Sequence, residues 1–162
     1  MTLAKIKGIA ANGQQRERNL NAGPTPSSRR MPTVEVSWGE LIDKITILEI
    51  KEQRLTSPQA VANVRRELAT LTRVVRDLQP QPAELDELKQ RLKSINENLW
   101  QIEDQIRAKE AKRSFDPQFI ELARSVYIKN DERARIKRRI NELLKSEFVE
   151  EKQYTPYAPL GA

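Results

Sequence analysis

Five polar residues interrupt the apolar stripes of this chain, and they are the residues best placed to do chemistry. They are two acids, one arginine and two amides: Asp43, Glu49, Arg133, Asn96 and Asn130. A carboxylate buried in a helical protein needs a cation or hydrogen-bond donors beside it. The set therefore predicts an ion pair with amide hydrogen bonds, which either fixes the register of packed helices or binds a small polar molecule.

The residue types that this chain lacks remove the usual catalytic groups of most enzyme classes. It has no cysteine and no histidine, so thiolate nucleophiles, thiolate metal sites and the commonest general base are missing. No glycine occurs between Glu40 and Leu160, which excludes a glycine-rich phosphate loop and a calcium loop from that stretch. We predict no metal and no cofactor, and we favour a non-catalytic protein.

The elements that must position these residues are amphipathic helices. Apolar residues recur at alternating spacings of three and four in one long stretch, which is the heptad pattern of a helix packed along one seam against another helix. They are Leu85, Leu88, Leu92, Ile95, Leu99, Ile102 and Ile106. This periodicity predicts an all-α protein, an antiparallel bundle or hairpin of three to four helices.

Cap residues and prolines set the expected boundaries of the helices. Ser37 with Glu40 matches a capping box, and Ser57 and Asp116 each precede a proline at the first helical position. The predicted helices span about 38–55, 58–78, 83–110 and 117–145, within a domain of residues 34–147. The first two helices form either a hairpin or one bent rod, and the sequence leaves both arrangements open.

The two ends of the chain lack helical periodicity. Residues 1–33 carry six basic residues against one acid, while the remainder has 23 basic and 22 acidic residues. The basicity therefore belongs to a flexible arm, which is the part suited to nucleic acid. Met31 offers an alternative translation start. Val34 and Val36 alternate with a polar residue and predict a short strand, and residues 148–162 predict an extended tail.

A polar layer across the bundle is expected where the seam of the last helix breaks. Between Val126 and Ile136 this seam passes through Lys129 and Arg133. An antiparallel register brings Asn96 near Asn130. The first helix is apolar around nearly its whole circumference, so Asp43 or Glu49 on it is expected to be buried against one of these cations.

The same excess of apolar surface on the first helix predicts a homo-oligomer, because one bundle face cannot cover it. The interface candidates are Trp38, Leu41, Ile45, Leu48, Trp100 and Tyr127. The basic run from Arg133 to Arg139 is interpreted as a solvated face, since no aromatic residues interleave with it to stack bases.

Three segments resemble an uncharacterised bacterial domain family. They are VEVSWGELIDKITILEIK (34–51), NENLWQIEDQIRAKE (96–110) and ELARSVYIKNDERARIKRRINELL with FVEEKQY (121–154). Sequences of this family occur as stand-alone proteins, as appendages to sugar-transferase or repeat proteins, and in bacteriophages. The family-like positions include Asp43, Glu49, Asn130, Asp131 and Glu151. The resemblance implies no activity, but it does imply a partner in cell-envelope sugar transfer or a phage assembly.

The function expected from these observations is protein interaction by helix-face packing, and the expected location is the cytoplasm. No membrane anchor is expected, because no apolar run approaches the roughly 20 residues of a membrane helix. Two alternatives stay open. The polar layer predicts a small-molecule enzyme or binding protein if a cavity opens onto Glu49, Asn130 and Arg133. The basic arm predicts nucleic-acid binding if residues 1–33 carry the interaction.

Overall fold

The structure, a computed structural model, describes residues 33–153 and 155 and is all-α in that range. Its helices are α1 (Trp38–Arg54), α2 (Pro58–Arg76), α3 (Glu84–Ala111) and α4 (Pro117–Leu143). The predicted strand is absent from this part of the chain. Val34 and Val36 lie in an irregular stretch and are 74% and 54% exposed, and no second strand lies among the described residues to pair with them.

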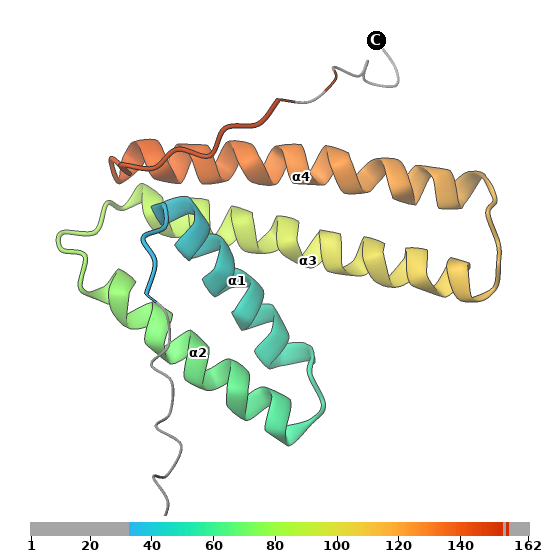
Figure 1. Cartoon of the computed structure of the whole chain (residues 1–162), viewed down its shortest axis with the longest axis horizontal. Coiled ribbons are helices and arrows are strands. Elements are labelled where there is room, and N and C mark those ends of the chain that lie inside the picture. The colour runs from blue at the N-terminus through green and yellow to red at the C-terminus, as the bar shows by residue number, and fades with distance from the viewer. Residues whose placement is uncertain (1–32, 154, 156–162) are drawn as a thin grey trace, which may run out of the picture. The chain divides into compact units, whose positions relative to one another are not determined.

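The helices form two antiparallel hairpins, α1 with α2 and α3 with α4 (Figure 1). The alternative of one bent rod is therefore wrong, since the short link at residues 55–57 folds α2 back onto α1. Helix α1 contacts all three other helices. The sequence signal for this placement is its apolar circumference, because a helix that is apolar all round must be surrounded.

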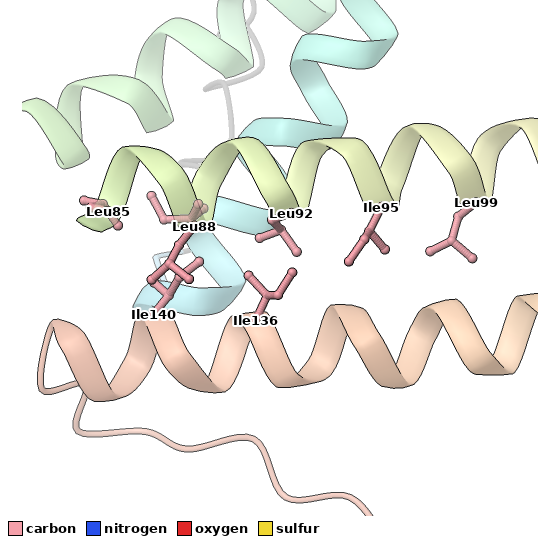
Figure 2. Packing of buried hydrophobic residues seen from close by; sticks show 8 residues of the cluster. Leu85, Leu88, Leu92, Ile95, Leu99, Ile136 and Ile140 are labelled. Atoms are coloured by element: carbon pink, nitrogen blue, oxygen red, sulfur yellow. The ribbon is translucent and has the colours of Figure 1, made fainter. Parts of the chain in front are cut away.

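A hydrophobic cluster of the core lies between α3 and α4 near the open end of their hairpin (Figure 2). The cluster consists of five residues of α3 on the side facing α4, two residues of α4, and Ile42 of α1. The α3 residues are Leu85, Leu88, Leu92, Ile95 and Leu99, and the α4 residues are Ile136 and Ile140. Leu92 and Ile140 are fully buried. The core therefore uses the heptad positions of the sequence.

Side chains cap three helices at their first turns. The side chains of Ser37, Ser57 and Asp116 accept hydrogen bonds from the backbone N–H of the residue three positions on. Glu40 departs from the expected capping box, because its carboxylate pairs with Lys137 of α4. The cap of α1 is thus tied to the tertiary structure.

The ends of α3 and α4 use non-glycine residues in the left-handed conformation. Arg113 has a φ of 52° and Lys145 a φ of 51°. Ser114 and Ser146 then donate their backbone N–H groups to the carbonyls of Lys109 and Asn141. Glycine is the usual residue at such positions. This stretch of sequence contains none, so arginine and lysine take the strained conformation.

We expect the cap of α4 to make stability depend on acid pH. Asp116 accepts hydrogen bonds from Lys109 Nζ, from the backbone of Phe119 and from Ser114, and these partners lower its pKa to about 2. A carboxyl whose pKa falls on folding stabilises the native state above its unfolded pKa and loses that contribution as the pH drops toward 2. In thermal unfolding, the melting temperature of wild type should exceed that of Asp116→Asn at pH 6. At pH 2 the two melting temperatures should be equal.

A constant difference between the two proteins at both pH values would contradict this role, because the asparagine side chain cannot titrate.

No helix in the described part of the chain has the length and apolarity needed to span a bilayer. The predicted basic arm at 1–33 falls almost entirely outside the described residues. Residues 148–153 of the predicted tail carry no helix or strand, and most of the remaining tail lies outside the described range.

Candidate functional site

The centre of the candidate site is an ion pair between α1 and α4. Arg133 Nε donates to Asp43 Oδ1 at 2.9 Å, and Arg133 Nη2 donates to Asp43 Oδ2 at 2.5 Å. Such two-point pairing fixes the orientation of both planar groups. Asp43 is 3% exposed, so its charge depends on this arginine for compensation.

Two amides and one hydroxyl complete what we call the Asp43 cluster (Asp43, Thr46, Asn96, Asn130 and Arg133). Asn96 Nδ2 donates to Asp43 Oδ1 and to Thr46 Oγ1, both at 2.9 Å. Arg133 Nη1 donates to Asn130 Oδ1 at 3.2 Å. Residues of α1, α3 and α4 therefore meet in one hydrogen-bonded layer, as expected for a buried polar group whose partners must come from the protein.

The electrostatics of this layer favour the charged form of its arginine. Hydrogen bonding to Asp43 raises the pKa of Arg133, and this effect outweighs the desolvation that lowers it. The guanidinium therefore stays protonated and acts as a fixed donor. It is a means of positioning and binding rather than a proton-transfer group.

Glu49 lies outside the Asp43 cluster, so its predicted place there is wrong. It pairs with Lys89 at 2.7 Å and Lys93 at 3.2 Å, both on α3. Burial raises the pKa of Glu49, but the hydrogen bonds and charges of the two lysines outweigh it and lower the pKa overall. Glu49 lies six residues after Asp43 on α1, and its side chain reaches α3 rather than α4.

A second polar contact between α1 and α4 was not predicted. Lys137 is 5% exposed and pairs with Glu40 of α1 and with Glu150 of the segment after α4. Gly39 N donates to Asn141 Oδ1 at 2.6 Å. The basic run is thus only partly a solvated face. The sequence did contain a signal for this contact, because the polar residues at positions 133, 137 and 141 recur at intervals of four and so share one face of α4.

A cleft of ≈ 300 Å³ adjoins the Asp43 cluster and is lined by residues of α1, α3 and α4. Asn96, Asn130 and Arg133 contribute to its lining together with Trp100, whose ring centroid lies 5.6 Å from the Arg54 guanidinium. The cavity that would favour an enzyme was expected to be lined by Glu49, Asn130 and Arg133. The cleft is lined by Asn130 and Arg133 but not by Glu49. Within residues 33–153 and 155, no group of three acidic residues is gathered at a metal-binding spacing.

Comparison with known proteins places this sequence in one family. The family described as a family of unknown function (DUF6165) matches residues 32–160. The chain belongs to this family. The DUF6165 match spans all four helices and the whole Asp43 cluster. No curated protein and no solved structure matches the chain significantly.

The interface residues predicted for this DUF6165 protein divide into two groups. Leu41, Ile45 and Leu48 are 9% exposed or less, so they are core residues between helices and not contacts for another molecule. This prediction was wrong because α2, α3 and α4 together cover the apolar surface of α1. Trp38 packs against the core and Trp100 lines the cleft, whereas Tyr127 is 38% exposed.

Proposed function

We propose that this protein is a non-catalytic interaction module that pairs with a second copy of itself through the far end of the α3–α4 hairpin. The observation that carries the proposal is a contrast in burial along one continuous seam. Near the open end, the seam residues from Leu85 to Leu99 on α3, with Ile136 and Ile140 on α4, are at most 7% exposed. Toward the turn between the helices, the equivalent apolar residues are only half-buried or exposed.

We call the residues toward the turn the distal surface: Ile102, Ile106, Phe119, Ile120 and Leu122. Four of them are half-buried and Ile120 is 56% exposed. Phe115 extends the surface, since its ring packs edge-on against Phe119 at 5.2 Å and is 57% exposed. Figure 1 shows that α3 and α4 continue here beyond α1. Where α3 and α4 pack only on each other, these apolar side chains keep part of their surface in solvent, and further helices could cover that surface.

A second copy of the chain fits this requirement better than a foreign helix. Each copy exposes the same surface, so a twofold arrangement of two hairpins buries both surfaces at once and forms a four-helix bundle. Charge favours the same arrangement. Residues 100–129 hold six cations and five anions, so two copies meet with little net repulsion.

Substitution of one exposed residue tests the proposal. We expect sedimentation equilibrium to show a dimer for wild type, and Ile120→Glu to weaken dimerisation by roughly tenfold or more, because it places a charge in an apolar interface. Val74→Glu is the matched control, since Val74 is 47% exposed on α2, outside the distal surface.

A wild-type protein that stays monomeric at the highest concentration it reaches would overturn the proposal. Equal effects of the two substitutions would overturn it as well. A monomer that instead binds a helix from another protein would assign the distal surface to a different partner.

Two other expectations remain predictions. Nucleic-acid binding through residues 1–33 concerns a segment that is almost wholly outside the described range. Attachment to cell-envelope or phage machinery rests on the family resemblance.

A further inference from the structure

The cleft beside the Asp43 cluster has hydrogen-bonding groups that the fold does not use. Asn96 commits both N–H groups of its amide to Asp43 and Thr46. Among the hydrogen bonds within residues 33–153 and 155, both side-chain bonds of Asn96 are made by Nδ2 and none by Oδ1, and Asn96 lines the cleft. An amide oxygen that lines a cleft without a protein partner is an acceptor available to a ligand.

Donors lie next to this acceptor in the lining of the cleft. Asn130 accepts from Arg133 through Oδ1 and donates one N–H of Nδ2 to the carbonyl of Val126, which leaves its second N–H. Each terminal nitrogen of Arg133 also carries a second N–H beyond the bonds to Asp43 and Asn130. The cleft therefore offers one acceptor and several donors side by side.

The charge of the cleft argues against an anionic ligand. The guanidinium of Arg133 is already neutralised by its two-point pairing with Asp43. At the rim, Arg107 pairs with Glu103 at 3.6 Å, and Asp104 adds one further negative charge. A carboxylate or phosphate would enter a site without excess positive charge, so an uncharged ligand is favoured.

The walls add a preference for shape. Trp100 contributes a flat ring beside the Arg54 guanidinium, and Ile47, Ile50 and Leu99 supply apolar surface around it. A volume of ≈ 300 Å³ is at the small end of the range for ligand pockets. A molecule of one or two rings fits this volume.

From these observations we infer that the cleft binds a small, planar, uncharged molecule that carries a carboxamide-type donor and acceptor pair. The N–H of such a ligand meets Asn96 Oδ1, its carbonyl meets the N–H groups of Asn130 and Arg133, and its ring lies along the apolar wall. This inference goes beyond the proposed self-association and does not depend on it.

Titration of the full chain with nicotinamide tests the inference, with nicotinate as the matched ligand that replaces the carboxamide by a carboxylate. We expect nicotinamide to shift the NMR signals of the Asn96 and Asn130 side-chain amides and of Arg133 Nε, with a millimolar dissociation constant typical of a ligand this small. Nicotinate should bind several-fold more weakly. Trp100→Leu should weaken nicotinamide binding several-fold, because it keeps an apolar side chain but removes the flat ring.

Three results would overturn the inference. The first is the absence of NMR shifts at these side chains when nicotinamide is added. The second is tighter binding of nicotinate than of nicotinamide, and the third is a Trp100→Leu variant that binds nicotinamide as tightly as wild type does. The comparison of the two ligands uses wild-type protein, so it holds even if Trp100→Leu does not fold. Repeating the titration with Ile120→Glu separates the cleft from dimerisation, because that variant should keep the shifts.

Discussion

Asp43→Ala is expected to destabilise the helical body by about 3–5 kcal/mol, the range for removing one partner of a buried ion pair. The carboxylate is 3% exposed and takes two hydrogen bonds from Arg133 and one from Asn96. Without it, a half-buried guanidinium has lost its counter-charge, and the amide of Asn96 has lost an acceptor. Urea unfolding followed by circular dichroism measures the loss.

Glu49→Ala is the matched control for this change. It lies on the same helix and removes a carboxylate that pairs with two lysines, but its side chain is 23% exposed and the lysines are 27% and 32% exposed. Pairs that reach solvent contribute about 0–1 kcal/mol. If both variants lose the same stability, the Asp43 cluster does not hold α1 against the hairpin, and the proposed geometry of the site is wrong.

The contrast between Asp43 and Glu49 also shows what the sequence could predict. Periodicity gives the direction of each side chain around α1, and both carboxylates point into an apolar surface. It does not give the angle at which α1 crosses the hairpin. Figure 1 shows α1 running obliquely to the α3–α4 hairpin, and α1 contacts both helices of that hairpin. Asp43 therefore meets an arginine of α4, whereas Glu49 meets lysines of α3.

The distal surface was hidden from sequence reasoning for a related reason. The heptad repeat continues without change from Leu85 to Ile106, so it predicts one seam of uniform burial. Burial depends on how far the third helix reaches, and this is set by the length of α1 and by its crossing angle. Leu99 is 7% exposed, while Ile106 one heptad later is only half-buried.

Gly39→Ala is the second change with a large expected effect, a loss of about 1–3 kcal/mol from overpacking. A Cβ atom on Gly39 would lie 2.6 Å from the carbonyl oxygen of Lys137 and 2.9 Å from Asn141 Oδ1. The first neighbour is backbone, so α1 and α4 must move apart, and the 2.6 Å hydrogen bond from Gly39 N to Asn141 lengthens with them. The higher helix propensity of alanine offsets at most about 1 kcal/mol of this loss.

Urea unfolding of Gly39→Ala beside Gln53→Ala separates steric overlap from helix propensity. Gln53 is exposed on the same helix, so its replacement by alanine should leave stability nearly unchanged. The displacement of α1 should also weaken the Asp43 cluster, because Asp43 lies one turn further along the same helix. The NMR signals of the Asn96 side-chain amide are then expected to shift in Gly39→Ala and not in Gln53→Ala. If Gly39→Ala were as stable as wild type or more stable, α1 would not pack this closely on α4, and the contacts that place Asp43 against Arg133 would lose their support.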